Sequence, residues 1–252
     1  MKFDSKIVLI SGGTRGIGKA TAVEFAKEGA TLALIYRSDN ASANNTLALL
    51  NGSGHRAYQC DISDAHAVKT TIEQIHKDYG QIDVLVNNAA VHKYHPIDKS
   101  TYNEWQAEWQ KTINVNVIGT SNLTYCTAQK MMERKSGKII FISSRGAFRG
   151  EPEMPAYGAS KAAINAMAQS LAQKLAAYNI HIGVVAPGFV ETDLTKEVLE
   201  GENGKAIKSQ SPMNRVAKPE EVAHAILFFA DPKSIWSTGA ILDLNGASYL
   251  RT

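Results

Sequence analysis

Tyr157 and Lys161 are separated by three residues in the Tyr-Gly-Ala-Ser-Lys sequence at 157–161. On a helix, side chains four residues apart lie on one face, next to each other. A free tyrosine has a pKa of about 10, and a neighbouring ammonium that favours the phenolate would lower that pKa. Such a phenol can exchange a proton with a substrate oxygen by general acid/base catalysis. The pair alone is weak evidence, because this spacing occurs by chance in many helices.

A glycine-rich segment from Ser11 to Gly18 follows an apolar stretch and precedes a stretch with helical periodicity. A turn of this kind lets the backbone approach a pyrophosphate at the N-terminus of a helix. Its spacing, G-x-x-x-G-x-G, differs from the usual G-x-G-x-x-G fingerprint. The segment predicts a dinucleotide-binding turn, with an ordinary tight turn as the alternative.

The end of the second predicted strand indicates which dinucleotide is bound. Enzymes that use NAD usually place a carboxylate there to bind the ribose 2′-hydroxyl, but this chain has Tyr36. Arg37 and Arg15 can offer guanidinium donors to a 2′-phosphate. We therefore predict NADP(H), with two alternatives: the arginines are solvated loop residues, or Asp39 reaches a ribose hydroxyl.

Together with further landmarks in the same order, these segments resemble the short-chain dehydrogenase/reductase family over nearly the whole chain. The further landmarks are Asp61-Ile62, Asn87-Asn88-Ala89-Ala90, Asn116 in an Asn-x-x-Gly sequence, Ser144, and Pro187-Gly188-Phe189-Val190-Glu191-Thr192. Ala90 departs from the family's glycine and adds one methyl group beside the cofactor. The resemblance implies an oxidoreductase that interconverts a carbonyl and a secondary alcohol by hydride transfer, without a metal.

The resemblance also implies a set of dinucleotide contacts. They are Gly12, Thr14, Arg15, Gly16, Ile17, Gly18, Tyr36, Arg37, Asp61, Ile62, Asn88, Ala89, Tyr157, Lys161, Pro187, Gly188, Val190 and Thr192.

By the same resemblance, Tyr157 exchanges the proton, Lys161 lowers its pKa and binds the ribose, and Ser144 holds the substrate oxygen. Ser143 is the competing serine. Adjacent strand residues point to opposite faces, so only one should enter the site, and the thirteen-residue spacing to Tyr157 favours Ser144.

The fourth catalytic residue implied by the resemblance is Asn116, which supports a water near the lysine. Asn114 is the alternative; on a helix it would face elsewhere.

Aromatic residues after the Asn-Asn turn could shape a substrate pocket. His92 and Tyr94 are predicted to lie either in the substrate pocket or on a polar surface loop, and the two alternatives stay open. His95 is expected on a polar surface loop. Trp105 and Trp109, four residues apart, are expected to be packing or interface residues.

These residues need a scaffold of alternating strands and helices. Apolar, β-branched stretches predict seven strands, at 6–11, 31–36, 56–60, 82–87, 138–144, 181–186 and 240–244. Helical periodicity covers 16–28, 64–79, 102–133, 157–178 and 219–230. The alternation predicts one doubly wound, Rossmann-type α/β domain with a parallel seven-stranded sheet over residues 1–252.

Composition excludes several other classes. The 252 residues carry a formal charge of +3 without a basic aromatic-laced stretch, which disfavours a nucleic-acid partner. Two cysteines are too few for a disulfide framework. No apolar run approaches a membrane span and no secretory signal is recognisable, so we expect a cytoplasmic protein with a small-molecule substrate.

Two expectations concern regions around the site. The polar segment 191–211 is interpreted as a substrate lid, with a solvated surface insertion as the alternative. The helices at 102–133 and 157–178 resemble those that pair across the family's main dimer interface, which implies a homotetramer; Asn245-Gly246-Ala247 departs from the family's Asp-Gly-Gly.

For the substrate, the run 184–194 is most similar to 3-oxoacyl-carrier-protein reductases, and Arg134 and Lys135 fit a carrier contact, although a second basic position of that group is Tyr178 here.

A non-catalytic dinucleotide sensor need not keep all four catalytic residues. A nucleotide-sugar epimerase needs a longer chain, and thioester enoyl reductases space tyrosine and lysine farther apart. Carbonyl reduction is therefore favoured, and turnover of the cofactor with any ketone would exclude the sensor.

Overall fold

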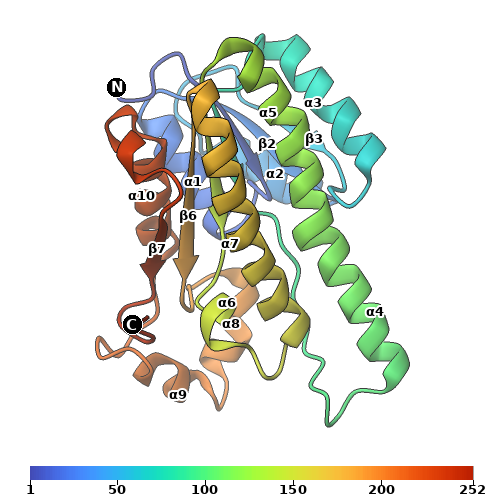
Figure 1. The fold of residues 1–252 in the computed structure, drawn as a ribbon. Coiled ribbons are helices and arrows are strands. Elements are labelled where there is room, and N and C mark those ends of the chain that lie inside the picture. Colours follow the sequence, from blue (N-terminus) through green and yellow to red (C-terminus); the bar gives the residue numbers. More distant parts are fainter. Residues whose placement is uncertain (252) are drawn as a thin grey trace.

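The computed structural model describes residues 1–251 and contains the predicted seven-stranded parallel sheet (Figure 1). The strand order is β3-β2-β1-β4-β5-β6-β7, and every neighbouring pair is parallel. The strands are β1 (Ile7–Ser11), β2 (Thr31–Tyr36), β3 (Arg56–Gln59), β4 (Val84–Asn87), β5 (Gly137–Ile142), β6 (Ile180–Pro187) and β7 (Ile241–Leu244). The predicted doubly wound fold is confirmed.

Helices cover both faces of the sheet. They are α1 (Gly16–Lys27), α2 (Asn40–Leu47), α3 (Ala65–Tyr79), α4 (Tyr102–Ile113), the π-helical segment η1 (Asn114–Gly119), α5 (Thr120–Arg134), α6 (Gly146–Arg149), α7 (Pro155–Leu175), the short η2 (Ala176–Tyr178), α8 (Asp193–Glu200), α9 (Gly204–Ser209), α10 (Pro219–Ala230) and η3 (Pro232–Ser237).

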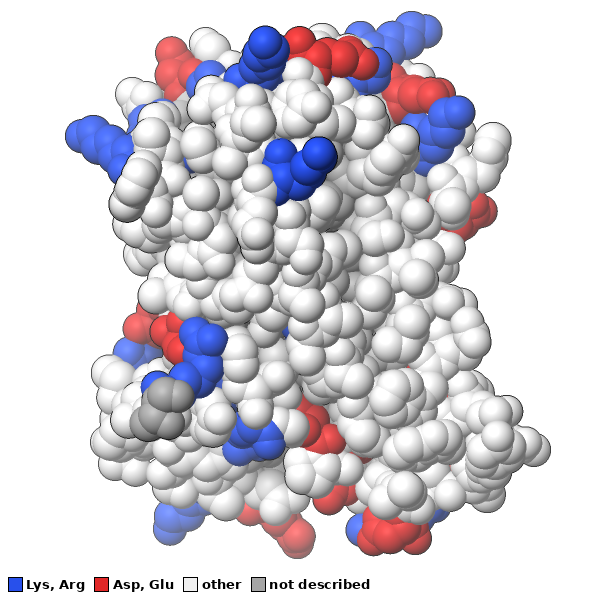
Figure 2. Space-filling view, viewed as in Figure 1, with Lys and Arg blue, Asp and Glu red and all other residues white. Residues whose placement is uncertain are grey.

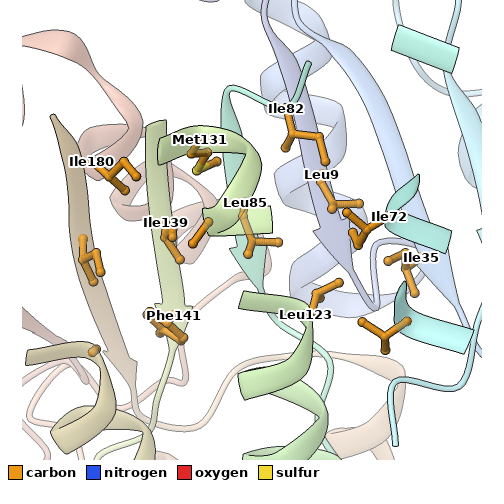
Figure 3. Packing of buried hydrophobic residues seen from close by; sticks show 14 of the residues in the cluster. Leu9, Ile35, Ile72, Ile82, Leu85, Leu123, Met131, Ile139, Phe141 and Ile180 are labelled. Atoms are coloured by element: carbon orange, nitrogen blue, oxygen red, sulfur yellow. The ribbon is translucent and has the colours of Figure 1, made fainter. Parts of the chain in front are cut away.

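Two apolar clusters hold these layers together. Alternate residues of one strand point to opposite faces, so Leu9 belongs to one cluster and Ile10 to the other. Figure 3 shows the first cluster, where strand residues such as Leu85 and Ile139 meet side chains from α3 and α5, including Ile72. The second cluster joins the sheet to α1 and α10. Burial on both faces explains why the strands are nearly continuous apolar runs.

The helix predicted over 102–133 is interrupted. The six residues of η1 separate α4 from α5, and π-helical turns of this kind occur frequently at functional sites. Four shorter helices, α2, α6, α8 and α9, were not predicted. They are four to eight residues long, too short for apolar periodicity to be recognised.

The strand order reverses between β1 and β4, because the chain crosses from β1 to β2 on one side and later returns to place β4 on the other. The loops that leave the carboxyl ends of β1 and β4 therefore diverge, and ligands of doubly wound sheets bind in the crevice at such a point. The glycine-rich turn and the Asn-Asn turn start at these two strand ends. None of the helices within residues 1–251 has the length and apolar character that crossing a membrane requires.

Candidate active site

Tyr157 and Lys161 lie in the first two turns of α7, which begins with Pro155. The Lys161 ammonium is 5.6 Å from the centre of the Tyr157 ring, as expected for residues four apart. Its Nζ donates a 2.7 Å hydrogen bond to the carbonyl oxygen of Ile142, the last residue of β5. Lys161 is only 4% exposed, and burial lowers its pKa to about 8. The end of β5 thus fixes the ammonium beside the phenol.

Tyr157 does not show the lowered pKa expected from its neighbour. Burial raises the pKa of Tyr157 to about 12, and the opposing effect of a hydrogen bond with Ser144 is smaller. The physical reason is that a phenolate loses solvation here, while the ammonium of Lys161 donates its hydrogen bond to the Ile142 carbonyl. The phenol therefore stays protonated at neutral pH.

The two candidate serines follow β5 rather than ending it, and they have different surroundings. Ser144 is half-buried, interacts with Tyr157, and accepts a 3.1 Å hydrogen bond from the backbone N–H of Gly146 at the start of α6. Ser143 is buried, and its hydroxyl donates to the backbone carbonyl of Lys161 at 3.3 Å. Ser144 is the serine beside the phenol, although it is a loop residue to which strand alternation does not apply.

Asn116 lies within η1 and is 1% exposed. Its Oδ1 accepts from the N–H of Val91 at 2.8 Å, and its Nδ2 donates to the Val91 carbonyl at 2.9 Å and to Ser160 Oγ at 3.0 Å. Asn114 instead accepts from Gln110 along the outside of α4. Asn116 therefore ties the loop after β4 to α7 at Ser160, which lies between Tyr157 and Lys161 in the sequence.

The glycine-rich turn has a backbone that other residues could not adopt without strain. Gly12 and Gly16 have φ of +64° and +50°. A Cβ on Gly18 would overlap the Gly12 carbonyl oxygen. Asn88 supports the turn from β4, because its Nδ2 donates to the carbonyls of Ser11 and Gly12 at 3.0 Å. This glycine-rich cradle at the start of α1 fits a dinucleotide pyrophosphate.

The neighbouring turn after β6 closes this cradle. Pro187 ends β6, and Gly188 donates its N–H to the Leu244 carbonyl at 3.0 Å. Val190 is 5% exposed and packs in the second cluster. Thr192 caps α8, and its side chain lies beside Gly16, where a Cβ would be 3.2 Å from the threonine methyl group.

The remaining predicted dinucleotide contacts line the same edge of the sheet. Thr14 is buried and its carbonyl accepts from Thr46 at 2.9 Å, while Ile17 packs against the second cluster. Asp61 is exposed after β3, and its Oδ1 accepts from the N–H and hydroxyl of Ser63. Ile62 is buried, and a Cβ on Gly119 would be 2.7 Å from its carbonyl oxygen.

At the end of β2, Tyr36 is half-buried, whereas Arg37 and Arg15 are exposed. Within residues 1–251 neither arginine forms a salt bridge. Asp39 caps α2, accepting from the N–H and hydroxyl of Ser42 with its two oxygens. These hydrogen bonds, with a smaller contribution from Arg15, lower the pKa of Asp39.

Comparison with known proteins agrees with this geometry. A family model described as Enoyl-(Acyl carrier protein) reductase matches residues 12–246. The 3-oxoacyl-[acyl-carrier-protein] reductase FabG of Thermotoga maritima is 35% identical over 250 residues, 98% of each chain. The protein of the same name from Escherichia coli is 32% identical, over 99% of this chain and all of the relative. The chain belongs to the short-chain dehydrogenase/reductase family.

A solved structure titled as NAD⁺-bound xylitol dehydrogenase superposes on this short-chain dehydrogenase/reductase with a TM-score of 0.89. It is 26% identical and covers 96% of this chain and 98% of its own. The protein is accordingly an oxidoreductase that acts on CH–OH or C=O groups and binds a nicotinamide dinucleotide.

In this oxidoreductase the loop after β4 differs from the expectation at one residue. His95 is not on a polar surface loop, because it is 2% exposed, with Nδ1 hydrogen-bonded to the Lys93 carbonyl at 2.7 Å and its ring 5.7 Å from that of Trp105. Trp105 in turn packs against Trp109 at 5.8 Å. The histidine thus holds the loop against α4.

Two neighbours of His95 have different positions. His92 meets the Tyr157 ring edge-on at 5.6 Å, and burial, with the charge of Lys161, lowers its pKa. Tyr94 is 54% exposed. His92 therefore belongs to the wall of the site, and Tyr94 lies on its outer surface.

Sequence reasoning missed two buried polar residues here. Ser160 accepts the hydrogen bond of Asn116 and donates to the Tyr157 carbonyl at 2.8 Å; its place inside the Tyr-x-x-x-Lys sequence was the available signal. Arg145 follows Ser144 and is 3% exposed. Arginine is almost never fully buried without a partner, so nothing in the sequence indicated this position.

Proposed function

We propose that the protein is an NADPH-dependent carbonyl reductase in which Tyr157 is the proton donor. The observation that carries this proposal is the meeting of Ser144, Tyr157 and Lys161 at the carboxyl end of β5. The glycine-rich cradle at the start of α1 lies at the same edge of the sheet.

The residues divide the chemistry between them. When bound, the nicotinamide supplies the hydride that adds to the carbonyl carbon. Ser144 Oγ hydrogen-bonds the carbonyl oxygen, and Tyr157 donates its phenolic proton to that oxygen as negative charge develops there. The ammonium of Lys161 then stabilises the phenolate left on Tyr157. With a pKa of about 12, Tyr157 carries the proton that it donates at neutral pH.

NADPH is proposed rather than NADH because of the residues around the ribose. Tyr36 replaces the carboxylate, and the exposed Arg15 and Arg37 have no salt-bridge partner within residues 1–251. Asp39 is held at the start of α2 by Ser42, which donates one hydrogen bond to each of its oxygens. The xylitol dehydrogenase structure contains NAD⁺, so the choice depends on these side chains rather than on the fold.

The first substrate class to test is the 3-oxoacyl thioesters, because the relatives described above carry the name of 3-oxoacyl-[acyl-carrier-protein] reductases. The four-residue spacing of Tyr157 and Lys161 favours carbonyl over enoyl reduction. The position of Arg134 does not favour a contact with an acyl carrier protein at the active site of the same chain. Its guanidinium donates to the Ile82 carbonyl at 2.6 Å and lies 3.4 Å from Asp83, at the amino ends of the strands. That edge is opposite to Tyr157.

The experiment is to follow NADPH and NADH oxidation with acetoacetyl-coenzyme A, a simple ketone and a sugar. Faster oxidation of NADPH with acetoacetyl-coenzyme A supports both parts of the proposal. Activity with ketones alone removes the thioester assignment, and no turnover with any carbonyl removes the reductase proposal.

A homotetramer is also proposed, supported by two separate apolar surfaces. Tyr102, Ile118 and Tyr125 are 72%, 47% and 66% exposed along α4, η1 and α5, and Figure 2 shows that the middle of the face over α7 is nearly free of charged side chains. At the other edge, Phe228 and Trp236 are 50% and 98% exposed. Two interfaces of this kind generate a closed tetramer. A monomeric mass by light scattering would contradict this assembly.

Residues 191–211 are proposed to form the substrate lid. They include α8 and α9, which lie beyond the carboxyl ends of β6 and β7 in Figure 1. The burial of Leu199 and Ile207 against the rest of the protein supports this proposal. Protection of this segment from proteolysis by NADPH would support the lid.

The cytoplasmic location of the protein stays a prediction.

A further inference from the structure

A cavity of about 320 Å³ lies beside the carboxyl end of β7, next to the loops that follow β5 and β6. Its walls come from those loops, from α9 and the segment after it, and from the C-terminal loop at 243–248. Ser144, Tyr157 and Lys161 do not line it. The volume is at the lower end of the range for small-molecule sites.

Arg145 forms part of the wall and is 3% exposed. Its two terminal nitrogens donate to Ser248 Oγ and Gln210 Oε1, which are both neutral, and its guanidinium carbon lies 5.2 Å from the centre of the Phe189 ring. A guanidinium has five N–H donors, so these two bonds leave donor capacity unused. Burial lowers the pKa of Arg145.

The acidic residues around the cavity are already paired with other arginines. Glu221 binds Arg215 through both carboxylate oxygens at 2.7 Å. Asp243 binds Arg251 at 2.7 Å. Within residues 1–251 no carboxylate lies within salt-bridge distance of Arg145. The buried guanidinium therefore has no carboxylate in direct contact, and the charge of Glu151, which is paired with Arg149, acts on it only from beyond salt-bridge distance. A buried charge without a partner in contact is strongly unfavourable.

We propose that this cavity binds a small organic carboxylate through Arg145. A carboxylate matches the planar fork of a guanidinium and would supply the missing charge. The single unpaired cation favours one negative charge over the two of a phosphate. Phe189, Ile207 and Met213 provide an apolar wall for the carbon part of the ligand.

The cavity is connected to the catalytic loops. Arg145 follows Ser144 directly, and its backbone N–H donates to the Pro187 carbonyl at 2.9 Å. Phe189 belongs to the turn that closes the dinucleotide cradle. A bound carboxylate would contact both loops, either as a second molecule or as the far end of an acidic substrate.

Benzoate is the probe, and its binding to the full-length protein is measured by calorimetry, with neutral benzamide as the matched compound. For so small a ligand we expect a Kd on the order of 1 mM. Benzamide should bind at least 10-fold more weakly. Absence of saturable benzoate binding to the wild-type protein, or equal binding of benzoate and benzamide, would overturn the proposal without the need for a variant.

Variants test the residue. Arg145→Met, which replaces the buried charge with an apolar side chain of similar length, should lose benzoate binding. Arg149→Met, four residues away, removes an arginine that does not line the cavity and should retain it. Equal loss in both variants, or retained binding in Arg145→Met, would contradict the assignment.

Kinetics separate the two sources of the carboxylate. Competition between benzoate and a 3-oxo acid, but not a neutral ketone, identifies the anion as part of the substrate. A benzoate effect that does not compete with either identifies a second ligand. The calorimetric titrations with benzoate do not require turnover. A negative result in them is therefore distinguishable from a lack of the proposed reductase activity.

Discussion

The buried ammonium of Lys161 should make the stability of this protein depend on pH in a predictable direction. Its pKa is lowered from 10.5 to about 8 by burial. Each pKa unit corresponds to about 1.4 kcal/mol, so the charged form costs about 3 kcal/mol relative to an exposed lysine. Lys161 is 4% exposed, so solvent screening does not reduce this figure much.

The direction in which stability changes with pH follows from the difference in proton binding between the folded and unfolded states. Below the folded pKa of about 8, Lys161 is charged in both the folded and unfolded states, and the destabilisation is fully present. Between about 8 and 10.5 the unfolded chain binds more protons, so stability rises with pH. Relative to Lys161→Met, the wild type should gain about 1 kcal/mol between pH 7 and pH 9.

Thermal unfolding of wild type and Lys161→Met at pH 7, 8 and 9 measures this difference. Taking the difference between the two proteins removes titrations that they share, and about 1 kcal/mol corresponds to roughly 2–4 °C in Tm for a domain of this size. A difference that is constant from pH 7 to pH 9 would refute the lowered pKa. The same pKa predicts that wild-type reduction falls above about pH 8, as the charge that stabilises the phenolate is lost.

Three other substitutions test the site. Tyr157→Phe should bind NADPH nearly as the wild type but lose about 10²-fold or more in turnover, because the proton donor is gone; steady-state kinetics and a binding titration separate the two effects. Gly18→Ala should weaken NADPH binding at least 10-fold, because its Cβ overlaps the turn. Gly80→Ala, at the end of α3, should lower stability because of its φ of +76° but leave binding unchanged in the same titration, because its Cβ meets nothing within 4 Å. Tyr36→Asp with Arg37→Ser should move preference toward NADH, mainly through KM; a wild type that already uses both equally well would contradict the phosphate role of the arginine.

The regular parts of the fold could be predicted because they depend on local pattern. The ends of the seven strands were located within two residues, since most of the strands are apolar runs buried on both faces. The interruption at η1 could not be predicted, because 102–133 has an unbroken helical pattern. The buried hydrogen bonds of Asn116 to Val91 and Ser160, 25 and 44 residues away, accompany the π-helical segment.

Predicted positions along the chain were more reliable than predicted electrostatics. The spacing of Tyr157 and Lys161 correctly indicated that the two side chains are adjacent. It did not indicate the raised tyrosine pKa, because desolvation depends on the residues that cover the phenol, and those come from distant segments such as the loop carrying His92.

Arg145 shows the same limit most clearly. Its polar partners, Gln210 and Ser248, are 65 and 103 residues away in the sequence, so no local pattern reveals that this arginine is enclosed. A surface arginine needs no counter-charge, but an enclosed one does, because water no longer solvates it. An arginine in the sequence therefore indicates an anionic ligand only when the structure shows that it is enclosed. For Arg145 the three-dimensional contacts provide that evidence.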